Sequence, residues 1–116
     1  MAIETMDVTY RGGGATLRGF LAEDRSASGK RPAVLVVQEW WGLNDYIRRR
    51  ARMLAELGYT ALAVDMYGDG KTGSNAAEAT ALMSAALADP KALEARFQAA
   101  CDRVGSRPTV DPAKIA

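Results

Sequence analysis

The sequence contains no histidine and only one cysteine, Cys101, among its 116 residues. Without histidine, the chain lacks the usual general base near neutral pH and the middle member of a Ser-His-Asp or Cys-His-Asp triad. A single thiol excludes an intramolecular disulfide, and without histidine beside it a Cys/His zinc cluster is excluded as well. These residues taken alone therefore complete neither such a triad nor such a metal centre.

An excess of one charge and a long apolar run are also missing. Fifteen Lys and Arg residues against fourteen Asp and Glu residues leave a net charge of +1, which creates no strong field for nucleic acid or an anionic membrane. The longest apolar run, Ala33 to Val37, is far too short to span a bilayer. The first residues show no secretory signal pattern. We therefore expect a cytoplasmic protein with no nucleic-acid or membrane partner.

The composition is that of a globular protein, with 48% hydrophobic and 25% charged residues. The length allows one domain at most, so residues 1–116 are expected to form a single domain. The strand expected at the end of the chain indicates that this domain is partial. Val8 and Tyr10 alternate with polar neighbours, Gly12–Gly14 interrupts the pattern, and an extended pattern resumes over Thr16–Ala22. This arrangement predicts an antiparallel hairpin.

The middle of the chain predicts a βαβ unit. Pro32–Gln38 and Tyr59–Val64 have the continuous apolar character of strands buried on both faces, as in a parallel sheet. Between them, Asn44 or Asp45 can begin a helix and Gly58 can end it. The predicted inner face of that helix consists of Leu43, Ile47, Ala51, Leu54 and Leu57.

Two more helices and a strand are expected after this unit. Asn75 and Glu78 have capping-box spacing, and Asp89-Pro90 supplies an N-cap and an N1 proline. The expected inner faces are Ala79, Leu82, Met83, Ala86 and Leu87 in the first helix, and Leu93, Phe97, Ala100, Cys101 and Val104 in the second. After a turn at Asp111-Pro112 a further strand begins near Ile115, which predicts an incomplete sheet.

The residues most suited to chemistry lie in Gln38–Asn44, between a buried parallel strand and a helix N-terminus. Ligands bind at this edge of open α/β sheets, and helix N-termini there offer unpaired N–H groups. Glu39, followed by Trp40 and Trp41, is a candidate functional carboxylate. In the alternative interpretation, Glu39 makes a local cap or ion pair and the two indoles cover the core.

Three motifs carry a resemblance to a known family. The segments Pro32–Asn44 (PAVLVVQEWWGLN), Arg52–Tyr59 (RMLAELGY) and Ala63–Gly68 (AVDMYG) resemble the N-terminal half of a dienelactone hydrolase. The resemblance implies an α/β-hydrolase fold, which this chain would enter with its hairpin and βαβ unit. It further implies a Cys nucleophile in a G-x-C-x-G elbow, with an Asp and a His further along. None of these three groups is present here in such a setting, and Ile115-Ala116 resembles the start of the strand that leads to the elbow.

The resemblance also assigns roles to residues that are present. Glu39 matches the glutamate that lies against the catalytic thiol, and Trp40 matches the residue whose backbone N–H forms half of the oxyanion hole. Trp41 and Tyr67 are expected to form a wall of the substrate pocket. The implied substrate is a small ester or lactone, with no cofactor. Members that hydrolyse dienelactones hold the substrate carboxylate with an arginine after D-x-Y, and no arginine occurs between Thr72 and Lys91.

Other candidate residues have structural interpretations. Cys101 lies on an apolar helix face, where a buried inert thiol is expected. The basic cluster Arg48–Arg50 with Arg52 is expected to be a solvated face, with Asp45–Arg49 and Arg52–Glu56 at ion-pair spacing. We expect Asp65 to bind loop N–H groups. The glycine-rich segments Gly68–Lys71 and Gly12–Gly14 lack the spacing of phosphate and dinucleotide loops.

Two hypotheses of different classes follow. In the first, the chain is the N-terminal portion of a dienelactone hydrolase-like ester or lactone hydrolase, inactive alone because it lacks nucleophile and histidine. In the second, it is a stand-alone binding or assembly module without catalysis. Under both, an open edge beside the most apolar strand predicts a homo-oligomer.

Overall fold

The computed structural model describes all 116 residues, which form five strands and three helices. Along the chain these are β1 (Ile3–Gly12), β2 (Ala15–Asp24), β3 (Arg31–Val36), α1 (Asp45–Glu56), β4 (Thr60–Ala63), α2 (Ala76–Leu87), α3 (Pro90–Gly105) and β5 (Val110–Ile115). The predicted hairpin, βαβ unit, two later helices and last strand are all present in the expected order.

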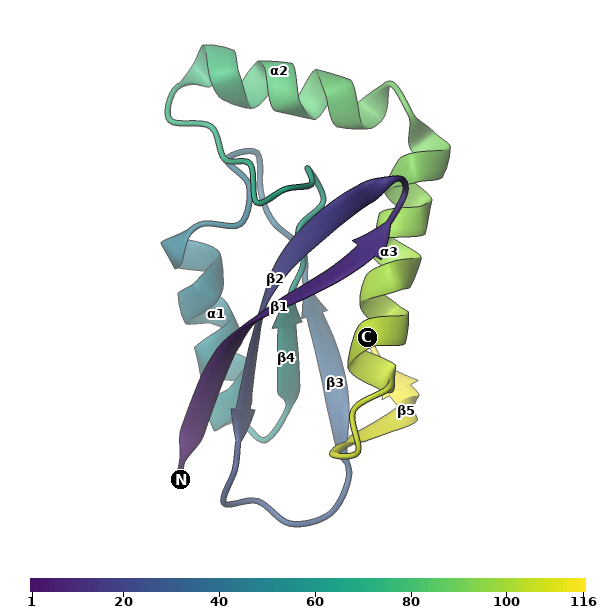
Figure 1. Ribbon diagram of the computed structural model, residues 1–116. Coiled ribbons are helices and arrows are strands. Elements are labelled where there is room, and N and C mark those ends of the chain that lie inside the picture. The colour runs from purple at the N-terminus through teal and green to yellow at the C-terminus, as the bar shows by residue number, and fades with distance from the viewer.

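The five strands form one mixed sheet in the order β1-β2-β4-β3-β5 (Figure 1). β1 and β2 are antiparallel, β2 is antiparallel to β4, and β3 is parallel to both β4 and β5. The most apolar strand, β3, therefore lies between β4 and the last strand. This strand order agrees with the α/β-hydrolase fold that the family resemblance implies.

A two-residue turn joins β1 to β2. Gly13 and Gly14 both have positive φ, +58° and +73°, which suits the primed turns of tight hairpins. A Cβ on Gly13 would lie 2.5 Å from the carbonyl oxygen of Ala92 in α3. Glycine at this position therefore lets the tip of the hairpin pack closely against α3.

Helices cover the two faces of the sheet separately. Ile47, Ala51 and Ala55 of α1 are buried with one set of strand side chains, which comprises Phe20, Ala22, Ala61 and Ala63. Ala100 and Val104 of α3 are buried against the other set, which comprises Val8, Leu21, Ala33, Leu35, Leu62, Val64 and Val110. Successive residues of β2 and β4 alternate between these clusters because strand side chains point to opposite faces in turn.

Three predicted helix faces were partly wrong. Leu57 is the C-cap of α1 and is exposed, because it lies on the side of the helix away from the buried residues Ile47, Ala51 and Ala55. In α2 only Ala79 is buried, and Met83 and Leu87 are exposed. Phe97 of α3 is exposed as well. Helical spacing identifies an apolar face, but here α2 lies across the end of the sheet and away from its faces (Figure 1).

β5 forms one edge of the sheet. It pairs with β3 at Val110 and at Ile115, with an irregular register between these points. The amide of Ala116 donates to the carbonyl of Ala33 at 3.0 Å, and the amide of Leu35 donates to the carbonyl of Ala116 at 2.8 Å. The expectation of an open edge beside β3 is therefore wrong, because β5 covers β3 at these positions. The two edge strands of the sheet are β1 and β5. None of the three helices is long and apolar enough to cross a membrane.

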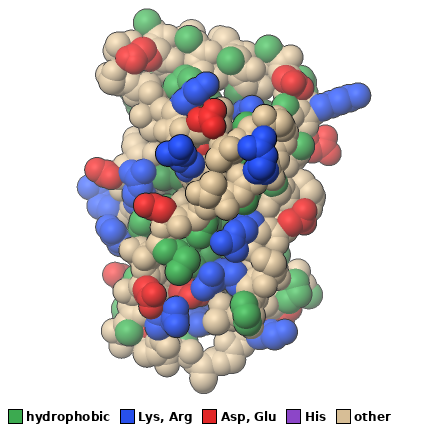
Figure 2. All heavy atoms as spheres, in the orientation of Figure 1, with side chains coloured by type: hydrophobic (Ala, Val, Ile, Leu, Met, Phe, Trp, Pro, Cys, Tyr) green, Lys and Arg blue, Asp and Glu red, His purple; other side chains and the backbone are tan.

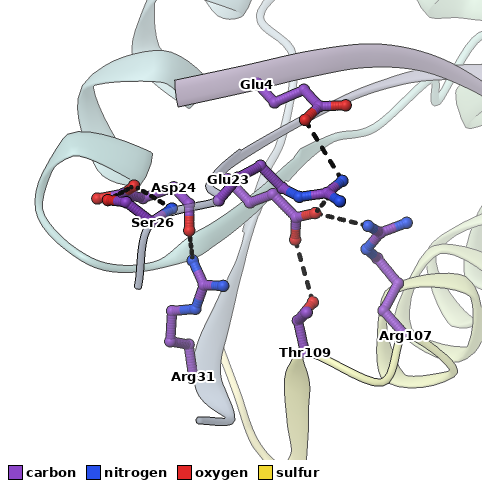
Figure 3. A network of polar contacts seen from close by, with 8 residues as sticks. Glu4, Glu23, Asp24, Ser26, Arg31, Arg107 and Thr109 are labelled. Carbon is purple, nitrogen blue, oxygen red and sulfur yellow. Dashed lines mark hydrogen bonds and ion pairs between the residues drawn. The ribbon is translucent and has the colours of Figure 1, made fainter. Parts of the chain in front are cut away.

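A polar network ties the end of β2 to the segment between α3 and β5 (Figure 3). Glu23 is almost fully buried, and its Oε1 lies 2.6 Å from Arg107 Nη2. Its other oxygen accepts a hydrogen bond from the Thr109 hydroxyl at 3.0 Å. Arg25 lies between Glu23 and Glu4, at 3.9 Å and 3.4 Å. The network is at the amino end of β3, opposite to the end that bears Gln38–Asn44.

Candidate functional site

The segment Val37–Asn44 connects the carboxyl end of β3 to the first turn of α1. The segment Asp65–Gly70 follows β4, which is parallel to β3, so both segments lie at the same edge of the sheet. Asn44 is the N-cap of α1, and its Oδ1 accepts a hydrogen bond from the Ile47 amide at 3.3 Å. The candidate residues are thus at the sheet edge where α/β proteins bind ligands.

Three hydrogen bonds hold the β3–α1 segment in place. The side-chain oxygen of Gln38 accepts from the Met66 amide at 2.8 Å, and the Tyr67 hydroxyl donates to the Trp40 carbonyl at 2.7 Å. The Gly73 amide donates to the Trp41 carbonyl at 3.0 Å. Since all three partners follow β4, the two segments form one connected unit.

The peptide between Glu39 and Trp40 has a fixed orientation. Its carbonyl, on Glu39, accepts a hydrogen bond from the Gly42 amide at 3.1 Å. The chain has no cis peptides, and in a trans peptide the N–H points away from the carbonyl. The Trp40 N–H therefore points away from Gly42, and it donates no hydrogen bond within the chain. It is an oriented, unused donor.

Gly42 is required by this turn. Its φ is +96°, a conformation that L side chains rarely adopt. A Cβ on Gly42 would also lie 2.7 Å from the carbonyl oxygen of Lys71. Glycine at this position therefore allows the turn and the close approach of the segment after β4 at the same time.

An apolar groove of about 310 Å³ lies beside the oriented amide. Ten residues line it: Val37, Gln38, Glu39, Trp40, Met66, Tyr67, Met83, Ala86, Leu87 and Leu93. The exposed apolar residues of α2 thus face the candidate site, which explains why they are not in the core. The groove is open, and it suits an apolar ligand group next to a hydrogen-bond donor.

The structure brings three of the four predicted site residues to this groove. Glu39, Trp40 and Tyr67 line it. Trp41 does not, but its ring packs on that of Trp40, with centroids 5.0 Å apart and a tilt of 48°. Glu39 is exposed, and its carboxylate forms no ion pair within the chain. Burial raises the pKa of the Tyr67 hydroxyl, partly opposed by the nearby Gln38 side chain, so Tyr67 is a neutral donor at physiological pH.

Asp65 has the structural role expected of it. It is 1% exposed and accepts hydrogen bonds from three backbone amides, those of Arg18 at 2.9 Å, Gly68 at 2.9 Å and Gly70 at 2.8 Å. Both of its oxygens accept from backbone donors, as is usual for a buried carboxylate that fixes a loop. Asp65 therefore fixes the conformation of the loop that contains Tyr67, and neither of its oxygens is free for catalysis.

No pattern in the sequence indicates the role of Arg96. This residue is in α3, and its Nη1 donates to the carbonyls of Met66 at 2.8 Å and Tyr67 at 3.2 Å. It fastens the segment after β4 to α3 and so supports the position of the Tyr67 hydroxyl. A lone arginine in a predicted helix carries no pattern for such a contact. Gln38 was part of the quoted motif, but its bond to Met66 required the structure.

The remaining candidates lie elsewhere. Cys101 is half-buried, and burial raises the pKa of its thiol, in keeping with the expected inert role. It lines a different groove, together with Pro112 and Ile115. In α1, Arg48 pairs with Asp45 at 2.9 Å, whereas the expected pairs of Arg49 and Arg52 do not form. Nowhere in the chain do three or more Cys, Asp or Glu side chains converge as metal ligands do.

Comparison with known proteins agrees with this geometry. The dienelactone hydrolase family matches residues 17–116. The Escherichia coli (strain K12) protein YghX, a hydrolase fragment by name, is 51% identical over 53 residues, which are 46% of this chain and 45% of that protein. A Saccharolobus solfataricus protein, a carboxymethylenebutenolidase by name, is 43% identical over 61 residues, which are 53% of this chain and 23% of that protein.

A solved structure shows the same fold. The crystal structure of a dienelactone hydrolase-like promiscuous phosphotriesterase from metagenomic libraries superposes with a TM-score of 0.91 at 37% identity. The match covers 99% of this chain and 48% of the other. The chain thus spans less than half the length of each of these three proteins.

Proposed function

This chain belongs to the dienelactone hydrolase family, and we propose that it forms the oxyanion side of an active site that hydrolyses carboxylic esters or lactones. The observation that carries the proposal is the Trp40 N–H, which is oriented by the Glu39–Gly42 hydrogen bond and donates to nothing within the chain. An oxyanion hole needs this kind of donor, held in place before the reaction begins.

The Trp40 N–H has one role in the proposed reaction. When a thiolate attacks the ester carbonyl, the carbonyl oxygen gains a negative charge, and a hydrogen bond from the Trp40 N–H stabilises it. The C–O bond then breaks, the alcohol leaves with a proton, and water hydrolyses the remaining thioester. Loss of one oxyanion donor typically lowers the rate by a factor of about 100 to 1000. In this proposal the attacking thiolate and its histidine come from residues outside these 116.

The Tyr67 hydroxyl helps to fix the orientation of the Trp40 N–H. It binds the Trp40 carbonyl, so both peptides that flank Trp40 are fixed, one by Gly42 and one by Tyr67. Glu39 is free of ion pairs and lies at the same groove. Its carboxylate is therefore available to accept a hydrogen bond from a thiol placed against it, which is the role that the family resemblance gives it.

The groove favours a neutral, apolar acyl group. Eight of its ten lining residues are hydrophobic, and Glu39 is the only charged one. No arginine occurs between Thr72 and Lys91 to bind a substrate carboxylate. We therefore propose simple esters or neutral lactones, rather than dienelactones, as the substrate class.

Two measurements on the purified chain test the proposal. With p-nitrophenyl butyrate we expect no turnover above background, because the nucleophile is absent; turnover that survives repeated purification contradicts this. In ¹⁵N-labelled protein, n-butylphosphonate, which mimics the tetrahedral oxyanion, should shift the Trp40 amide resonance. Tyr67→Phe should weaken that shift several-fold.

The matched control is Tyr59→Phe, which removes a hydroxyl that has no hydrogen-bond partner in the chain. We expect it to leave the phosphonate response unchanged. If the Trp40 amide does not respond, or if Tyr59→Phe and Tyr67→Phe weaken the response equally, Trp40 is not the oxyanion donor.

A second candidate function is a non-catalytic assembly module. The observation that favours it is the unpaired outer side of β5, the last strand in the sheet. An open strand edge is a template for pairing with another chain. We propose that any homo-oligomer of this chain forms there.

A further inference from the structure

The helix α1 has a second apolar face that the fold does not use. Its inner face, Ile47, Ala51 and Ala55, is buried on the sheet. On the opposite side, Tyr46, Met53 and Leu57 follow one another at spacings of seven and four residues, which places them on one stripe of the helix. Their exposed fractions are 40%, 50% and 74%. We call these three residues the outer stripe.

Arginines flank the outer stripe. Arg49 and Arg50 lie on its two sides, and Arg52 follows one turn from Arg48. The one ion pair in α1 joins Arg48 to Asp45 at 2.9 Å, so Arg49, Arg50 and Arg52 have no carboxylate partner within the chain. Figure 2 shows Lys and Arg side chains gathered along the side of the molecule where α1 lies. The only acidic residue on this part of the helix is Glu56, which forms no ion pair.

These arginines are held in place by aromatic rings. The guanidinium of Arg50 lies 5.3 Å from the centre of the Tyr46 ring, and its Nε donates to the Tyr46 hydroxyl at 3.1 Å. The guanidinium of Arg49 lies 5.9 Å from the same ring. Arg52 lies over Phe20 at 5.4 Å. Stacked guanidinium groups have already lost part of their rotamer freedom, so binding an anion costs them less entropy.

We propose that the outer face of α1 is a docking site for an acidic amphipathic helix of another protein. The apolar side chains of such a helix would cover Tyr46, Met53 and Leu57, and its Asp or Glu residues would pair with Arg49, Arg50 and Arg52. Tyr, Met and Arg are the residue types enriched in protein interfaces. A groove of about 280 Å³, lined by Tyr46, Arg49, Arg50, Arg52, Met53 and Glu56, receives the apolar side chains.

Charge complementarity selects this occupant over a second copy. Two copies that meet through this face would bring three unpaired arginines of each copy together, and the one carboxylate, Glu56, could not neutralise them. Like charges in contact are strongly unfavourable. The net charge of +1 also gives little attraction to nucleic acid or an anionic bilayer beyond this one helix.

The experiment uses the full 116-residue chain and a designed probe. The probe is an 18-residue, end-capped helical peptide with leucines along one face and glutamates on both sides of them. We expect it to bind at least tenfold more tightly than the same peptide with Gln for Glu, and the difference to shrink at high salt. NMR shifts of the ¹⁵N-labelled protein should be confined to α1.

Variants of α1 test whether the peptide binds to the outer face of this helix. Arg49→Gln with Arg50→Gln, and separately Met53→Ser, should each weaken binding at least fivefold, while Arg11→Gln, an exposed arginine of β1, should leave it unchanged. These side chains are exposed, so the melting temperatures should stay the same; if Met53→Ser fails to fold, Leu57→Ser replaces it. Equal binding of the Glu and Gln peptides, or no loss in the α1 variants, overturns the proposal.

The same experiments distinguish a protein partner from other possible occupants of the outer face of α1. Preferential binding to phosphatidylserine-containing vesicles, or to a 20-base DNA, over the acidic peptide overturns the assignment to a protein partner. Self-association that Met53→Ser abolishes shows that a second copy occupies the face and overturns it as well.

Discussion

Glu23 and Arg107 form an ion pair at 2.6 Å across 84 positions of the sequence. The carboxylate is buried at the end of β2, and the guanidinium belongs to the connection between α3 and β5. Together with Thr109, this pair fixes where β5 begins beside β3 (Figure 3). These contacts therefore link β2 to β5, which are not neighbours in the sheet.

Arg107→Met should be strongly destabilising. It leaves the buried Glu23 carboxylate without its closest cation, and breaking a buried pair from one side costs about 3 kcal/mol or more. Arg25→Met is the control, since Arg25 is half exposed and lies 3.9 Å from Glu23; it should cost less than about 1 kcal/mol. Urea unfolding measures both. Equal free energies of unfolding for the two variants would show that the Arg107 pair contributes nothing.

Ser26→Ala should raise the pKa of Asp24. The Ser26 hydroxyl, with the amides of Ala2 and Ser26, lowers this pKa from its ordinary value of 3.8 to about 2. A depressed pKa in the folded state gives stability that is present above about pH 4 and is lost as the pH falls to about 2. In Ser26→Ala this acid dependence should weaken. NMR titration of the Asp24 carboxyl carbon measures the pKa, with Ser28→Ala as a control in the same loop.

Tyr10→Phe should change how stability depends on pH in the alkaline range. Burial, assisted by the negative charge of Asp65, raises the pKa of Tyr10 to about 12. The folded state therefore favours the neutral phenol, and the stability from this preference is full below about pH 10 and is lost as the pH rises to 12. Thermal unfolding from pH 8 to 12 should show a steeper decline for the parent chain than for the variant. Parallel declines would contradict the assignment.

Gly42→Ala and Gly58→Ala should differ although both glycines have φ near +100°. A Cβ on Gly42 would lie 2.7 Å from the Lys71 carbonyl oxygen, whereas a Cβ on Gly58 meets nothing within 4 Å. Both substitutions incur about 1 kcal/mol of backbone strain; Gly42→Ala adds the clash and should cost about 1 to 3 kcal/mol more. Chemical denaturation measures both, and similar losses would mean that the β3–α1 turn can move away from Lys71.

Self-association of the chain should occur through β5. The outer side of β5 pairs with no strand, so sedimentation velocity at tens of micromolar should show a dimer or larger species. Hydrogen exchange should then show concentration-dependent protection in Val110–Ile115. A stable monomer throughout that range would count against the homo-oligomer.

Local signals determined the elements of this fold. The capping residues Asn44, Asn75 and Asp89 begin the three helices as expected, because an N-cap depends only on residues within one turn. The first four strands were placed to within a few residues by their extended or apolar patterns. The turn expected at Asp111-Pro112 was wrong, because these residues lie inside β5, which begins at Val110. The oxyanion segment, by contrast, was assigned from family resemblance, and residue types alone left Glu39 open between a functional and a structural role.

Contacts between distant segments could not be derived from local patterns. Helical spacing put Leu57, Met83, Leu87 and Phe97 in the core, and all four are exposed, because periodicity marks an apolar face without saying what covers it. The i,i+4 spacing also predicted ion pairs for Arg49 and Arg52, but these side chains stack on Tyr46 and Phe20 instead. Helix geometry alone could not predict that Arg49 contacts Tyr46 or that Arg52 contacts Phe20.

The sequence by itself determined the order of the elements, their caps and the absence of a triad, because each depends on residue type and short-range spacing. Only the tertiary structure decided that Arg107 meets Glu23, that Arg96 fastens the Tyr67 segment, and that the Trp40 N–H is left unpaired beside an apolar groove. Each of these depends on how the sheet and its two helical layers pack, which brings together residues that are tens of positions apart in the chain.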